Sequence, residues 1–197
     1  MEIKKIFKNN KKWIDEQLAI DANYFKNLGK GQNPDMLYIG CSDSRVTTKE
    51  MMGLDTGDVF VHRNIANMVS SNDLNVMSVI HYAVDTLKVK HIVVCGHYAC
   101  GGVKAAMEFE DTGALNPWLK NIKKVIKNHQ KELNTIENEE EKYNRLVELN
   151  VQEQYLNLIK TRVVQKAVKN RGLKIHGWVF DIHTGKLIDL KIKDKTI

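Results

Sequence analysis

The sequence has few cysteines and no long apolar segment. Three cysteines in 197 residues are an odd number, which argues against a disulfide framework and favours metal ligation or chemistry. No apolar run reaches the roughly 20 residues that a membrane-spanning helix needs. The start, MEIKKIFKNNKKW, lacks the apolar core of a signal peptide. We therefore expect a cytoplasmic protein that makes no membrane contact.

Aromatic residues are also scarce, at 7%, and they do not alternate with basic residues in a stripe. The net charge is +6, but the lysines are spread along the chain and mixed with acids, such as the Glu139-Glu140-Glu141 run. Such a pattern is typical of a solvated surface and disfavours a nucleic-acid partner. The length and the apolar content of 43% suit one domain over residues 1–197, with residues 1–30 as an N-terminal helical arm.

Short apolar runs alternate with segments of helical spacing. The runs 36–39, 58–62 and 91–95 are apolar without alternation, as in strands covered on both faces. We expect an α/β fold with a central, mainly parallel sheet flanked by helices. A C-terminal hairpin is expected at 175–182 and 187–192. Helical patterns cover residues 2–28, 74–87, 101–131 and 138–170. A capping box at 47–50 predicts the start of a further short helix, and residues 71–73 offer a cap for the 74–87 helix.

Two segments carry the residues with distinctive chemistry. Cys41 begins a C-x-D-x-R segment just after the first strand, and His97 and Cys100 follow the third strand. Ligand sites of open parallel sheets form outside the carboxyl ends of the strands, so these segments point to one place. Thiolate and imidazole are ligands that zinc prefers, and three of them leave a fourth position open for catalysis. The sequence therefore predicts a catalytic zinc site.

Asp43 and Arg45 are spaced to fold back on each other beside this site. A bidentate contact with arginine would fix the direction of the carboxylate and keep it ionised. The carboxylate could then accept a hydrogen bond from bound water, or bind the metal itself. A solvent-facing ion pair is the plainer alternative. Cys95, inside a strand, is interpreted as a small buried apolar residue.

The combination C-x-D-x-R and H-x-x-C-G-G resembles the β-class carbonic anhydrases. The resemblance extends through residues 61–67, 91–97, 148–151 and 175–178 and covers almost the whole chain. It implies one zinc ion per subunit, bound by Cys41, His97 and Cys100, with Asp43 and Arg45 as a catalytic dyad. The implied reaction is reversible hydration of carbon dioxide to bicarbonate and a proton, by attack of zinc-bound hydroxide.

The resemblance also implies a substrate pocket shared between subunits. Gln32, Phe60, Tyr82 and Gly101 match positions that contact or enclose the substrate. A homodimer is then the smallest complete unit, and a tetramer is common in the family. The N-terminal helical arm corresponds to a segment that wraps a partner subunit.

One bacterial subtype of the family is inhibited by bicarbonate and closes its site by placing the dyad aspartate, here Asp43, on zinc. Arg63 and Gly40 match that subtype. Tyr38, however, stands where the subtype has tryptophan, and Phe180 where it has tyrosine. The resemblance thus implies a closed state with Asp43 as fourth ligand, but weak inhibition by bicarbonate.

Two rival functions fit the same residues. An enzyme of this fold acting on carbon disulfide or carbonyl sulfide would have the same metal site and a different pocket. A structural zinc domain that serves as an interaction module would need a fourth protein ligand, for which Asp43 is the nearby candidate. The resemblance to the β-class carbonic anhydrases favours carbon dioxide hydration.

Overall fold

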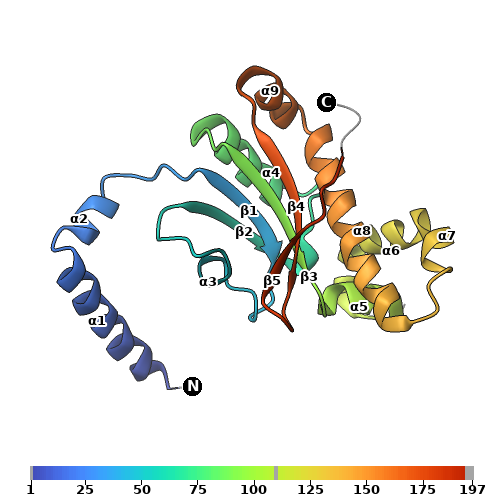
Figure 1. The fold of residues 1–197 in the computed structure, drawn as a ribbon, viewed down its shortest axis with the longest axis horizontal. Coiled ribbons are helices and arrows are strands. Elements are labelled where there is room, and N and C mark those ends of the chain that lie inside the picture. The colour runs from blue at the N-terminus through green and yellow to red at the C-terminus, as the bar shows by residue number, and fades with distance from the viewer. Residues whose placement is uncertain (1, 109–110, 194–197) are drawn as a thin grey trace. The chain divides into compact units, whose positions relative to one another are not determined.

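The computed structural model describes residues 2–108 and 111–193 (Figure 1). The chain divides into two compact units, Met1–Asn33 and Pro34–Ile197. No helix in the described part of the chain is both long and apolar enough to span a bilayer.

The N-terminal unit contains two helices, α1 (Ile3–Ile20) and α2 (Tyr24–Leu28), where the sequence predicts one helix over 2–28. The break lies at Asp21, whose backbone is extended and whose carboxylate accepts a hydrogen bond from the Asn23 N–H at 2.8 Å. Local side-chain bonding of this kind competes with the helical pattern. Trp13 packs edge-on against Phe25, with ring centroids 5.2 Å apart. No residue of α1 is buried.

The larger unit is built on a five-stranded sheet in the order β2-β1-β3-β4-β5. The first four strands in this order run parallel, and β5 closes an antiparallel hairpin with β4, as the sequence predicts. Each predicted strand is present, with ends moved by a few residues. The strands are β1 (Met36–Cys41), β2 (Val59–Asn64), β3 (His91–His97), β4 (Lys174–Asp181) and β5 (Lys186–Asp189).

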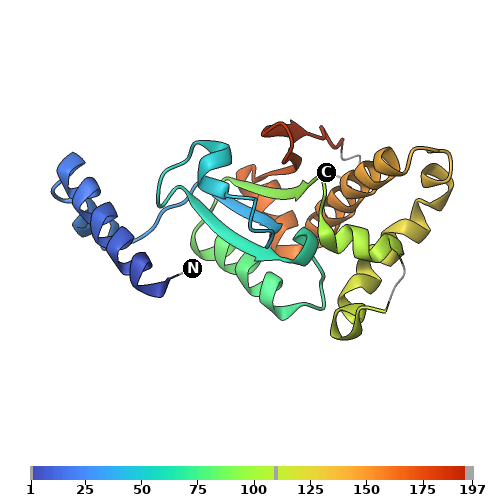
Figure 2. The same cartoon turned by 90° about the horizontal axis from the view of Figure 1, so that it is seen from below.

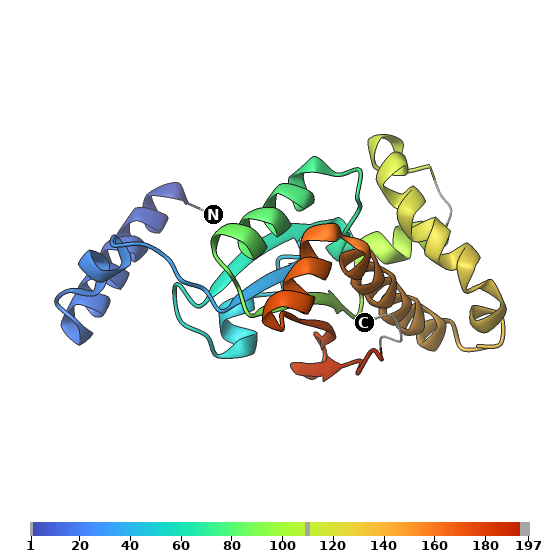
Figure 3. The same ribbon diagram turned by 90° about the horizontal axis from the view of Figure 1, so that it is seen from above.

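Helices cover the sheet unequally on its two faces. Leu37 and Ile39 of β1 and Val94 of β3 belong to the main core, which α4 (Leu74–His81), α8 (Glu139–Lys160) and α9 (Arg162–Arg171) complete. On the opposite face, Tyr38 and neighbours form a smaller cluster with Met51 and Met52 of α3 (Thr48–Met52). Figures 2 and 3 show α3 and α4 on opposite sides of the sheet.

The two long helical stretches of the sequence are divided in the structure. The 101–131 stretch contains α5 (Gly101–Glu108), η3 (Gly113–Leu115), α6 (Asn116–Asn128) and the start of α7 (Gln130–Leu133). The 138–170 stretch breaks at Thr161, whose backbone is extended and whose hydroxyl donates to the Asn157 carbonyl at 3.0 Å. Two short turns, η1 (Ile65–Asn67) and the π-helical η2 (Tyr82–Thr86), complete the fold. Thr47, the predicted cap of α3, makes no capping hydrogen bond with its side chain.

Tyr38 and Gly40 pack tightly on the smaller face of the sheet. They lie two apart in β1 and therefore share a face. The Tyr38 ring is fully buried and occupies the space where a side chain at position 40 would begin. A Cβ added to Gly40 would overlap ring atoms of Tyr38.

We expect Gly40→Ala to lower the free energy of unfolding by about 1–3 kcal/mol, because overpacking forces the buried ring to move. Urea unfolding of the single variants and of Tyr38→Ala/Gly40→Ala measures the effect. In the Tyr38→Ala background the added cost of Gly40→Ala should disappear. An equal cost in both backgrounds would show that the ring is not the obstacle.

Candidate metal centre

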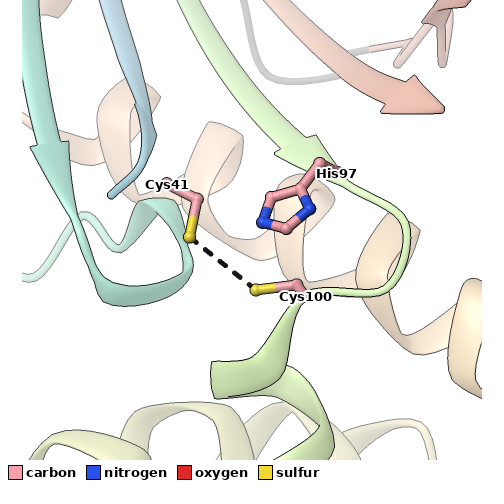
Figure 4. Close-up of side chains that lie close together, drawn as sticks. All are labelled: Cys41, His97 and Cys100. Carbon is pink, nitrogen blue, oxygen red and sulfur yellow. Dashed lines mark hydrogen bonds between the residues drawn. The ribbon is translucent and has the colours of Figure 1, made fainter. Parts of the chain in front are cut away.

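Cys41, His97 and Cys100 converge from the ends of three elements (Figure 4). Cys41 is the last residue of β1, His97 is the last residue of β3, and Cys100 directly precedes α5. Their ligand atoms all lie within 4.8 Å of one another, and the two sulfurs are 3.9 Å apart. Two sulfurs bound tetrahedrally to zinc at about 2.3 Å would be about 3.8 Å apart. The spacing therefore fits a metal ion.

The His97 ring is oriented for metal binding through one nitrogen. Nδ1 lies 2.8 Å from the Tyr98 carbonyl oxygen, which can only accept, so Nδ1 carries the proton. Nε2 is left as an acceptor, and it is buried without a hydrogen-bond partner among the described residues. A buried acceptor without a partner is costly in a metal-free protein. A cation between the three side chains would satisfy it.

Two contacts act on the cysteine thiols. The contact between the sulfurs has the largest effect on the pKa of each thiol, and backbone N–H groups of Asp43 and Ala66 further lower the pKa of Cys41, while those of Gly102 and Val103 oppose the rise in the pKa of Cys100. The hydrogen bond from Cys100 lowers the pKa of Cys41, and the same contact raises the pKa of Cys100. One thiolate therefore forms readily, while the second needs a cation beside it.

Asp43 lies beside the cluster and is held by Arg45. The guanidinium donates to both carboxylate oxygens, at 2.9 and 2.7 Å, and the Arg45 backbone N–H adds a third bond at 3.0 Å. The hydrogen-bonded Arg45 side chain holds the pKa of Asp43 well below its usual range. One carboxylate oxygen is 3.7 Å from His97 Nε2. The arrangement keeps a charged, oriented acceptor next to the position that a metal would occupy.

The remaining residues predicted for substrate lie in different parts of the structure. The rings of Phe60 and Tyr82 are neighbours, with centroids 5.8 Å apart, and Tyr82 is 46% exposed. Gly101 starts α5 next to Cys100, and the space beside its Cα is open. Gln32 belongs to the N-terminal unit and is exposed. These roles stay predictions.

The residues predicted for bicarbonate regulation lie on the smaller face of the sheet or at its edge. Tyr38 and Phe180 belong to the same apolar cluster. The Arg63 guanidinium donates to the carbonyls of Cys41 and Asp43, at 2.8 and 2.6 Å. Arg63 therefore holds the backbone of the Cys41–Asp43 segment, a role that its sequence position did not reveal. The regulatory site stays a prediction.

Sequence reasoning also missed the contacts that α8 makes with the backbone near the Cys41, His97 and Cys100 cluster. Tyr143 donates to the Cys100 carbonyl at 2.6 Å, and Asn150 donates to the Ala66 carbonyl at 3.0 Å. Asn150 lies in the 148–151 motif, which contributes to the family resemblance but by itself indicates no role for this residue. Nothing in the local sequence distinguishes Tyr143.

Comparisons with known proteins agree with this geometry. A sequence model of the family described as carbonic anhydrase matches residues 36–187. A carbonic anhydrase of Emericella nidulans is 57% identical over 189 residues, covering 95% of this chain and 83% of its own. A tetrameric β-carbonic anhydrase structure from Sordaria macrospora aligns with a TM-score of 0.92 and 42% identity, over 95% and 96% of the two chains. A β-carbonic anhydrase structure from Aspergillus fumigatus gives 0.93 and 40%, over 97% and 91%. The chain therefore belongs to the β-class carbonic anhydrases.

Proposed function

We propose that this chain hydrates carbon dioxide reversibly, using one zinc ion held by Cys41, His97 and Cys100. The observation that carries the proposal is the buried acceptor His97 Nε2, which lies with two sulfurs inside a 4.8 Å cluster. Membership of the carbonic anhydrase family supports the substrate. When bound, zinc would supply the Lewis acidity that lets water lose a proton and attack carbon dioxide.

Residues of the chain would orient a water molecule beside that ion and accept its hydrogen bond. Asp43 stays ionised because Arg45 holds it, so its carboxylate can accept a hydrogen bond from a water molecule at the site. Both carboxylate oxygens are bonded to Arg45, which favours an acceptor beside the metal over a permanent fourth ligand. This contact is the main argument against a closed structural zinc site. A closed state would require Asp43 to give up part of its contact with Arg45.

A second subunit would complete the substrate pocket. Tyr82 is partly exposed beside Phe60, as a residue that faces another chain would be. In α1 the apolar side chains of Ile3, Phe7 and Ile20 are exposed, which fits an arm that binds a partner. The relative from Sordaria macrospora is described as tetrameric. We propose a homodimer or tetramer with Gln32, Phe60 and Tyr82 near the substrate.

We expect Asp43→Asn to retain zinc and to lower kcat/KM for carbon dioxide hydration at least about 100-fold, because it removes the charged acceptor. Stopped-flow assays with zinc analysis of the same samples measure both quantities. Asp35→Asn is the matched control, since Asp35 pairs with Lys90 and is exposed. Zinc loss in proportion to the lost activity would instead make Asp43 a structural ligand.

We expect the hydration rate to rise from about pH 6.5 to 9. Two thiolates cancel the charge of Zn²⁺, so the bound water should lose its proton at higher pH than the roughly pH 7 of an all-histidine site. Asp43 cannot cause the rise, because its pKa lies well below this range and it is ionised throughout. Buffer-saturated initial rates measure the profile. A flat profile would contradict the proposed ligand charges.

A further inference from the structure

Helix α8 contacts the backbone of Cys100 and the backbone of Ala66 in η1. The η1 turn directly follows Asn64, which pairs with Cys41 at the ends of β2 and β1. The Tyr143 hydroxyl donates to the carbonyl of Cys100, and the Asn150 amide donates to the carbonyl of Ala66. We propose that Tyr143 and Asn150 are positioning residues, which hold the two sulfurs at the separation that a metal ion requires. The inference rests on the proposed metal site and assigns these two residues a role within it.

The two residues are placed on α8 so that one helix reaches both loops. They are seven residues apart, which is about two turns and about 10 Å along the helix, and they share a face. Asn150 is 1% exposed, and its carbonyl oxygen accepts a hydrogen bond from Gln154 at 3.1 Å. Its orientation is therefore fixed from within the same helix. The fixed amide gives the Ala66 loop a rigid donor.

Both loops contain an alanine in the left-handed region, a backbone conformation that L-residues disfavour. Ala66 has φ 63° and Ala99 has φ 56°. The Ala66 conformation matters for the site because Ala66 lies two residues after Asn64, the residue that pairs with Cys41. Ala99 immediately precedes Cys100, and its carbonyl accepts from Arg45 at 3.2 Å. Loops in disfavoured conformations persist where the surrounding structure restrains them, and α8 supplies that restraint.

A third contact ties the residue between His97 and Ala99 to the same helix. The Tyr98 hydroxyl donates to Glu148 at 2.8 Å, and Arg145 donates to the other Glu148 oxygen at 2.7 Å. The Tyr98 carbonyl is also the acceptor that fixes the His97 ring. Tyr98 and Cys100 thus both have a hydrogen bond to α8. Tyr143 remains the most direct test, because its hydroxyl bonds to a ligand residue itself.

The decisive variant is Tyr143→Phe, which removes one hydroxyl from a partly buried ring and leaves the helix intact. Zinc affinity is measured by competition with a chromophoric chelator, and cobalt(II) is substituted to record the thiolate charge-transfer bands. We expect about a 10-fold loss of zinc affinity, as for other residues that orient metal ligands, with altered cobalt bands. Asn150→Ala should also lower zinc affinity. If Asn150→Ala does not fold, the result for Tyr143→Phe alone tests the inference.

Leu158→Val is the matched control for stability. Leu158 is fully buried in α8 but lies 15 residues, or about 22 Å, from Tyr143. It should lower the free energy of unfolding in urea without changing zinc affinity. Zinc affinity of Tyr143→Phe within twofold of the wild type would overturn the inference, as would an equal loss in Leu158→Val. If the wild-type chain bound no zinc, the proposed function itself would fail, which is a separate result.

Discussion

The parallel pairing of β1 with β3 is the constraint on which the site depends. Gly40 pairs with Cys95, so the next residues of both strands reach the same edge of the sheet. Cys41 and His97 therefore meet although 56 positions separate them in the sequence. A shift of one residue in this register would move Cys41 about 3.3 Å along the sheet relative to His97. The core side chains Ile39 and Val94, which pair and are fully buried, fix the register and with it the site.

Charge is the second constraint, because the site gathers two sulfurs that both become anionic when a metal binds. Backbone N–H groups offset part of this charge. Those of Gly102 and Val103 favour the thiolate of Cys100, and those of Ala66 and Asp43 favour the thiolate of Cys41. Arg45 brings a positive charge close to the site, and Asp43 neutralises it through a bidentate contact. The Asp43–Arg45 pair therefore adds no net charge beside the two sulfurs.

The sequence predicted the metal ligands because strand ends can be recognised from short apolar runs. All five strands and the convergence of Cys41, His97 and Cys100 were predicted in this way, since each depends on local pattern and on the general geometry of parallel sheets. That the three residues bind zinc stays a prediction. The breaks at Asp21 and Thr161 were missed because a side chain bonds to its own neighbouring backbone there. Tyr143 was missed for a different reason. Its partner is 43 residues away in the chain, and helical spacing only marks which residues face a core.

Gly40 shows how a sequence match can carry a different structural meaning. In the sequence, Gly40 only matches a residue of the bicarbonate-regulated subtype. In the structure, the fully buried Tyr38 ring fills the space that a side chain at position 40 would need. The glycine is therefore required by its own neighbour in the strand, whether or not an anion ever binds there. Arg63, the other matching residue, donates to the backbone of the Cys41–Asp43 segment. An anion bound by Arg63 would compete with these hydrogen bonds. Its binding would therefore disturb the backbone that carries Cys41 and Asp43.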